Sequence, residues 1–267
     1  MSLPRYPERI VCLTEETTET LYLLGEERRI VGISGYTVRP PRARREKPRV
    51  SSFLSAKQEK ILALEPDLVL GFSDLQADIA RDLARAGLNV MIFNQRSVDE
   101  ILSMIVTLSS LIGVPGKGEA LVERLEANLQ SVKATAKTFS HRPKVYFEEW
   151  DEPMISGIRW VSELVEIAGG EDVLSDLSHS QGAAGRTHDG QRVIESKPDV
   201  ILGSWCGKKF RPEKVAARPG WDRIPAVKND QLFEIKSAEI LQPGPAALTD
   251  GVRRIHDILR RHVDCSK

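Results

Sequence analysis

One phrase of sequence occurs twice, in corresponding places of the two halves of the chain. Residues 58–72 read QEKILALEPDLVLGF, and residues 190–204 read GQRVIESKPDVILGS. Aligning Pro66 with Pro198 also aligns the aspartate that follows and the glycine at the end of the apolar run. A helix, a Pro-Asp turn and a buried strand ending in glycine form a common α/β phrase, so one copy would carry little weight. Two copies in corresponding places predict two similar lobes.

The surrounding pattern supports this prediction. Short β-branched runs alternate with amphipathic stretches of helical period, which indicates mainly parallel sheets with helical crossovers. The first half opens with a strand at 9–13 and an acidic turn at 14–19, and the second with a strand at 144–147 and an acidic turn at 148–153. The basic stretch at 39–49 is interpreted as a solvated loop. The fold class is therefore α/β.

A helical region without strands separates the halves. A helix that begins after Pro115 and runs to about Phe139 would span on the order of 35 Å and would be a stiff connector rather than a flexible linker. We predict an N-terminal lobe at 1–114, a connecting helix at 115–140, and a C-terminal lobe at 141–267 whose final helix packs back onto the other elements.

Composition excludes several classes of protein. The formal net charge is +0, which argues against a general nucleic-acid binder. The three cysteines and five histidines lack metal-ligand or disulfide spacing, so we expect no metal and no required cofactor, and we interpret all five histidines as surface residues. The N-terminus has no apolar run long enough for a signal peptide or a membrane span. Either the chain is cytoplasmic, or a targeting segment was removed and it is periplasmic or otherwise extracytoplasmic.

Candidate ligand-binding residues are those that follow the predicted strands. Open parallel sheets bind ligands beyond the carboxyl ends of their strands, and two such sheets facing each other would leave a cleft between the lobes. The candidates in the first half are Glu15, Glu16, Tyr36, Arg39, Phe53, Phe72 and Asp74. Those in the second half are Glu149, Trp150, Trp160, Trp205, Cys206, Lys208 and Lys209.

Each group of candidates also has a purely structural explanation. Three of the four tryptophans fall at these positions, where aromatic faces could cover a flat ligand or simply pack in the core. The acidic turns could hydrogen-bond a ligand or hold a cation, but carboxylates also favour helix N-termini. Cys206 could be a metal ligand or a reactive thiol, although a lone cysteine is more often a packing residue. Glu16 and Glu149 could be an acid–base pair, but no nucleophile accompanies them, so we expect no catalytic residues.

An ordered set of motifs resembles one family: the substrate-binding proteins of ABC importers for cobalamin, haem and iron-siderophores, and most closely the cobalamin-binding branch. The motifs include ETLYLLG, VGISGYTVRPP, RVSSFLSAKQEKILALEPDLVLGF, ISGIRWVSELVEIAGGEDV and RPGWDRIPAVKNDQLFEI. The resemblance implies two Rossmann-like lobes joined by one helix, in a monomer that is not an enzyme. It further implies capture of a corrinoid, cobalamin foremost, between the lobes and delivery to the permease of an ABC importer.

The resemblance also suggests roles for single residues. Phe53 and Phe72 fall where cobalamin binders place aromatic rings against the corrin, and Arg39 falls where they have another aromatic residue. Glu59 matches a glutamate that docks onto arginines of the permease. The corresponding residue in the second lobe is Gln191, which departs from a symmetrical pair of docking carboxylates.

Two alternatives remain open from the sequence. The same importer role could serve haem or a ferric siderophore, in which case Arg39, Lys208 and Lys209 would meet ligand carboxylates and binding would weaken with salt. A cytoplasmic enzyme or chaperone acting on a tetrapyrrole would instead place Glu16, Glu149 or Cys206 in the chemistry.

Overall fold

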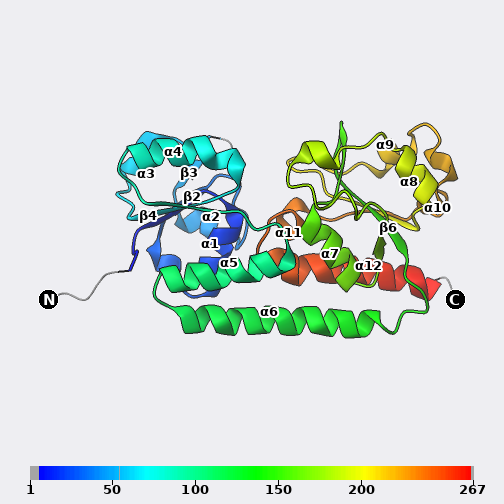
Figure 1. The fold of residues 1–267 in the computed structure, drawn as a ribbon, viewed down its shortest axis with the longest axis horizontal. Helices are drawn as coiled ribbons and strands as arrows, with labels where there is room; N and C mark the ends of the chain where they lie inside the picture. Colours follow the sequence, from blue (N-terminus) through cyan, green and yellow to red (C-terminus); the bar gives the residue numbers. More distant parts are fainter. Residues whose placement is uncertain (1–5, 54, 266–267) are drawn as a thin grey trace. The chain divides into compact units, whose positions relative to one another are not determined.

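The computed structural model describes residues 6–53 and 55–265 (Figure 1). The chain divides into two compact units. Unit 1 comprises the chain up to residue 95 together with 99–124, and unit 2 comprises 96–98 together with the chain from residue 125 onward. Helix α6, Pro115–Ala136, contributes residues to both units. The predicted α/β class is confirmed, and each unit has its own sheet.

The sheet of unit 1 is entirely parallel, with the strand order β3-β2-β1-β4-β5. Its strands are β1 Ile10–Cys12, β2 Ile30–Ser34, β3 Arg49–Ser51, β4 Leu68–Phe72 and β5 Val90–Phe93. From β1 the chain builds outward through β2 and β3, and then returns to add β4 on the other side of β1. The carboxyl ends of β1 and β4 therefore form a topological switch point, the usual ligand position in an open parallel sheet.

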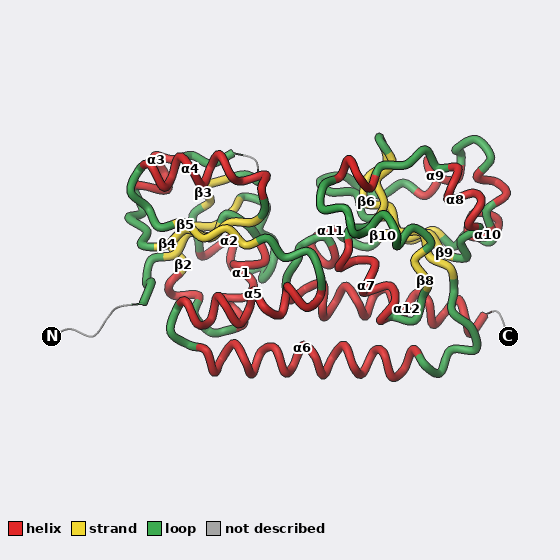
Figure 2. The backbone as a smooth tube through the Cα atoms, viewed as in Figure 1, coloured by secondary structure: helices red, strands yellow, loops and turns green. Residues whose placement is uncertain are grey.

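Helices cover both faces of this sheet (Figure 2). Helices α3 (Gln58–Leu62) and α4 (Ala77–Arg85) lie on one face, and α1 (Glu15–Leu23) and α5 (Val98–Leu111) lie on the other. Because side chains alternate along a strand, Val11 packs in the cluster with Ile61 and Leu83, whereas Cys12 faces the threonines of α1. The basic stretch is not only loop, because it contains the short helix α2, Ala43–Glu46, and leads into β3.

The sheet of unit 2 has the order β10-β9-β6-β7, with β8 also paired to β6. Its strands are β6 Lys144–Asp151, β7 Met154–Ser156, β8 Glu171–Asp172, β9 Val200–Gly203 and β10 Leu232–Glu234. Only β7 runs antiparallel among these pairings. The predicted acidic turn at 148–153 is wrong: β6 continues to Asp151, and the turn to β7 is Glu152–Pro153.

Helices again cover both faces in unit 2 (Figure 1). Helices α8 (Gln191–Ser196), α9 (Pro212–Ala216) and α10 (Pro225–Lys228) pack on one face through a cluster that includes Tyr146 and Trp221. The opposite side carries α7 (Arg159–Ile167), α11 (Ser237–Ile240) and α12 (Val252–Cys265), and α12 packs against α7.

Short helical turns complete the description. They are Glu27–Arg29, Asp74–Gln76, Ala183–Arg186 and Trp221–Arg223, together with a π-helical turn at Ala247–Gly251. Among the residues that the structure describes, no helix combines the length and apolar character needed to cross a membrane.

Candidate ligand-binding site

The switch point of unit 1 is lined by the first turn of α1. The Thr14 hydroxyl donates to Oε1 of Glu16 at 2.5 Å, and the Val38 amide, beyond β2, donates to Oε2 of Glu15 at 3.3 Å. One turn later, the Arg39 guanidinium donates to Glu19 at 2.9 Å. The ends of β1 and β2 thus bring together residues that lie twenty or more positions apart in sequence.

Burial controls the charge of the first two carboxyl groups. The pKa of Glu15 is raised to about 8 and that of Glu16 to about 7, chiefly by burial and in smaller part by neighbouring carboxylates. One oxygen of each carboxyl group has no hydrogen-bond partner within the described part of the chain. A protonated carboxyl group at this edge can donate a hydrogen bond as well as accept one.

The aromatic candidates of unit 1 are connected by a residue that the sequence did not single out. The Gln76 side chain donates to the Phe53 carbonyl at 2.9 Å and accepts from the Phe72 amide at 3.0 Å. Phe72 is buried, Phe53 is half-buried, and Tyr36 is 64% exposed. Tyr36 and Asp74 are therefore the candidates at this edge most open to solvent.

In unit 2, the end of β6 carries a buried ion pair. Arg218 donates to the two carboxylate oxygens of Glu148 at 2.5 and 2.9 Å, and the Trp205 indole donates to Oε1 of Glu148 at 3.0 Å. Trp205 is also part of the apolar core cluster. Its indole ring is therefore held in a fixed position in unit 2.

The same network extends to a histidine. The Gly190 amide donates to Nδ1 of His188, so the ring proton belongs on Nε2, which donates to the Tyr146 hydroxyl at 3.0 Å; the hydroxyl in turn donates to Glu148 at 2.9 Å. Burial lowers the pKa of His188 to about 4, so the ring is neutral. The interpretation of all histidines as surface residues is wrong for His188 and for the buried His256, because their rings are held by partners distant in sequence.

Trp160 also lies away from the ligand edge. It is 3% exposed, and its indole donates to the Ile240 carbonyl at 2.9 Å, so the expectation that it faces a ligand is corrected. Glu149 is occupied by Arg186, which donates to both its oxygens at 2.5 and 3.1 Å. Glu149 is therefore a salt-bridge residue of unit 2, whereas Glu16 belongs to unit 1.

Trp150 is the tryptophan that remains partly exposed. The Lys208 ammonium lies 3.9 Å from the centre of its ring and pairs with the buried Asp151 carboxylate. Lys214 donates to the other oxygen of Asp151 at 3.0 Å. The two lysines outweigh the effect of burial and lower the pKa of Asp151, so this carboxylate keeps its charge and holds Lys208 over the indole.

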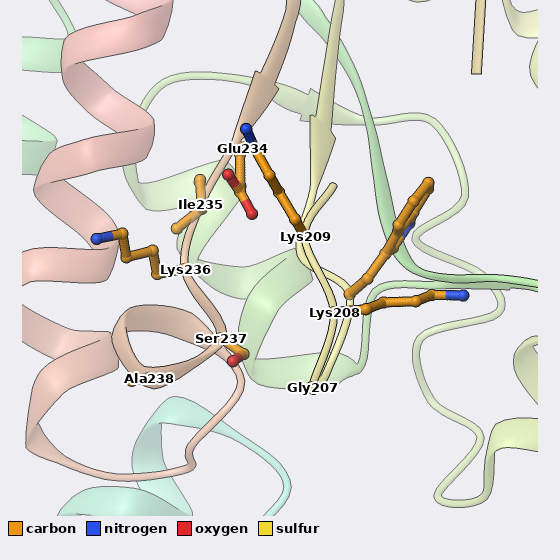
Figure 3. Close-up of a pocket in the computed structure, with 9 residues that line it drawn as sticks. Gly207, Lys208, Lys209, Glu234, Ile235, Lys236, Ser237 and Ala238 are labelled. Carbon is orange, nitrogen blue, oxygen red and sulfur yellow. The ribbon is translucent and has the colours of Figure 1, made fainter. Parts of the chain in front are cut away.

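Beyond β9 and β10 the surface of unit 2 forms an open hollow of about 390 Å³ (Figure 3). It is lined by Trp205, Gly207, Lys208, Lys209, Glu234, Ile235, Lys236, Ser237 and Ala238. Cys206, in the same loop, is exposed. Partial desolvation and the Glu149 carboxylate raise the pKa of its thiol, which does not favour a reactive thiolate.

The two docking candidates are exposed near the starts of short helices, Glu59 in α3 and Gln191 in α8. The Gln191 amide donates to the Glu195 carboxylate at 2.9 Å. The described residues contain no cluster of three or more histidine, cysteine or acidic side chains placed to hold a metal ion.

Residues 10–239 match the family described as periplasmic binding protein. The chain belongs to this family. It is a substrate-binding protein of the ABC importer type, a class that captures solutes without catalysing a reaction.

Relatives cover almost the whole chain. An ABC transporter substrate-binding lipoprotein of Bacillus subtilis, YvrC, is 25% identical over 96% of this chain and 81% of its own length. A vitamin B12-binding protein of Vibrio cholerae is 26% identical over 97% of this chain and 92% of its own. The structure of Staphylococcus aureus IsdE with haem superposes with a TM-score of 0.81 at 21% identity, covering 96% of this chain and 99% of that one, which shows the common fold.

Proposed function

We propose that the chain captures a corrinoid, cobalamin foremost, and delivers it to the permease of an ABC importer outside the cytoplasm. The observation that carries this proposal is that vitamin B12-binding proteins of two Vibrio species match 90% and 97% of the chain. Aromatic side chains at the carboxyl edge of unit 1 agree with it, because flat rings suit a corrin face. The protein acts as a monomer and requires no cofactor of its own.

In this proposal Tyr36, Phe53 and Phe72 supply apolar contact at the edge of unit 1. Glu15 and Glu16, whose raised pKa values leave them partly protonated near neutral pH, hydrogen-bond the amide side chains at the rim of the corrin. Arg39 orders this turn through Glu19. In unit 2, Trp150 is the exposed aromatic contact, whereas Trp160 and Trp205 support the fold behind it.

Haem or a ferric siderophore is the second candidate ligand. The lysines around the hollow of unit 2 favour it, because such ligands carry carboxylates or other anionic groups. The importer role is the same in both cases, so a comparison of ligands separates the two candidates.

Tyr36→Ala tests the corrinoid proposal, because this exposed side chain can be removed without opening the core. In equilibrium dialysis we expect the variant to bind cyanocobalamin about tenfold more weakly. Leu23→Ala is the matched control: it removes an exposed large side chain, 47% exposed, at the C-terminal end of α1, and binding should not change. Failure of the unaltered protein to bind cyanocobalamin at micromolar concentration would overturn the proposal, and binding of haemin alone would favour the second candidate.

A further inference from the structure

Two chain segments form the hollow of unit 2, and they lie at the carboxyl ends of the adjacent parallel strands β9 and β10. Residues 205–209 follow β9, and residues 234–238 run from the last residue of β10 into α11. The Trp205 ring and Ile235 give it an apolar wall. Gly207 has a φ of +80° and open space around its Cα, so a ligand group can approach the backbone of this loop closely.

The charged residues around the hollow are three lysines and one glutamate. Lys208 is already engaged by Asp151 and Trp150, and Figure 3 shows its ammonium directed away from the other two lysines. Lys209 and Lys236 are exposed, and within the described chain neither forms an ion pair. The Glu234 carboxylate, beside which Lys209 extends in Figure 3, accepts the Phe210 amide at 3.1 Å.

We propose that this hollow binds an anionic group of the transported ligand, a carboxylate or a phosphate, with Lys209 and Lys236 as its cations. The inference rests on the proposed function and specifies the chemistry of the ligand. Each lysine has a flexible four-carbon stem, so both ammonium groups can turn toward one anion that sits against the apolar wall. The Asp151 carboxylate holds the Lys208 ammonium in an ion pair, so Lys209 and Lys236 are the two lysines that remain to bind the ligand.

Three ligands with different anionic groups test this. Cyanocobalamin carries a nucleotide with a phosphodiester, dicyanocobinamide lacks that whole nucleotide, and haemin carries two carboxylates. If the anion is the corrinoid phosphodiester, Lys209→Gln with Lys236→Gln weakens cyanocobalamin about tenfold and leaves dicyanocobinamide unchanged. If the anion is a carboxylate, the same double variant weakens haemin. In either case the salt dependence of binding becomes shallower.

Two further variants make the result specific. Lys228→Gln removes the same charge from an exposed lysine at the end of α10, before β10 begins, and should leave all affinities unchanged. Glu234→Gln keeps an oxygen that can accept the Phe210 amide but removes the competing negative charge, so the anionic ligand should bind severalfold more tightly.

The outcomes separate this inference from the proposed function. If the unaltered protein binds a ligand, and the double variant binds it equally well with the same salt dependence, the inference is overturned and the importer role stands. If the unaltered protein binds none of the three ligands, the proposed function and this inference fail together. If Lys228→Gln weakens ligand binding as much as the double variant does, the inference is also overturned, because a general effect of charge would then explain the result.

Discussion

Glu16 and Glu26 are both buried carboxyl groups of unit 1, and their surroundings act on them in opposite directions. Burial raises the pKa of Glu16, whose second oxygen has no hydrogen-bond partner in the described chain. Burial would also raise the pKa of Glu26, but hydrogen bonds from Arg29 and Lys117 outweigh it and lower that pKa. The protonated form of Glu16 therefore stabilises the folded state, whereas for Glu26 the ionised form does so.

We predict that Glu16→Gln removes a pH dependence of stability. Between pH 4.5 and 7 the folded protein holds a proton on Glu16 that the unfolded chain loses, so the contribution of Glu16 falls as the pH rises through this range. The amide should therefore raise the free energy of unfolding at pH 8, by as much as about 3 kcal/mol. Urea denaturation of the unaltered protein and of the variant at pH 5 and pH 8 measures this difference in the free energy of unfolding. Glu26→Gln should lose stability at pH 8, and a loss for Glu16→Gln as well would contradict this account.

A second prediction concerns the buried pair Glu148–Arg218. Arg218→Met should cost about 3 kcal/mol or more, because it removes the cation that pairs with the Glu148 carboxylate in the core. The change should also shift the fluorescence of Trp205, which donates to the same carboxylate. Adding Glu148→Gln to Arg218→Met should recover part of the loss. Unchanged stability of the single variant would show that the ion pair does not hold this edge together.

Only part of this hydrogen-bond network around Glu148 could be predicted from the sequence. Tyr146 and Glu148 lie two positions apart on one strand, so they share a face by the period of a strand. Arg218 and Trp205 approach from segments more than fifty residues later, and no local pattern connects them. For this reason Trp205 could be identified as a strand-end residue but not as a member of the core.

At the scale of elements, each copy of the duplicated phrase has a glycine near the end of its strand, Gly71 in β4 and Gly203 in β9. A Cβ on Gly203 would lie 1.9 Å from the Phe210 ring, and a Cβ on Gly71 would lie 2.7 Å from the Gln76 amide oxygen. In both units the segment that follows the strand folds back over the glycine at or next to the strand's end. The glycines of the repeated phrase are thus explained by close packing rather than by an unusual backbone conformation.

We predict that Gly203→Ala displaces Phe210 and the loop that carries Lys209. The variant should lose about 1–3 kcal/mol of stability, and ligand affinity should fall because one wall of the hollow moves. Thermal unfolding and equilibrium dialysis measure the two effects. Gly182→Ala, at a glycine with open space around it, is the control and should behave as the unaltered protein. A fully stable Gly203→Ala variant with unchanged affinity would contradict the packing argument.

The length of β6 shows why the predicted acidic turn at 148–153 was wrong. Charged residues at 148–151 favoured a turn, because such side chains are rarely buried unless they are paired. Each acidic residue there has a cation from a distant segment: Arg218 for Glu148, Arg186 for Glu149 and Lys208 for Asp151. These pairings make the strand possible. By contrast, the apolar strands β1 and β4 could be predicted to within a few residues, whereas α2 and β3 were missed in and after the basic stretch.

At the scale of the whole molecule, the chain must both hold a ligand and deliver it. The two exposed docking candidates differ in charge, since Glu59 is acidic and Gln191 is not. We predict that Glu59→Gln lowers cobalamin uptake into vesicles that contain the cognate permease, by about tenfold, while leaving the affinity for the ligand unchanged. Gln191→Ala should have a smaller effect on uptake. Equal uptake by the Glu59→Gln variant would show that docking does not depend on this carboxylate.

The central claim is that the protein binds one corrinoid per chain and returns it unchanged. Calorimetric titration with cyanocobalamin, followed by recovery of the ligand and its absorbance spectrum, tests this most directly. We expect a single site with a Kd of about 1 µM or tighter and an unaltered spectrum after release. No heat of binding at micromolar protein, or recovery of a chemically altered corrinoid, would contradict it.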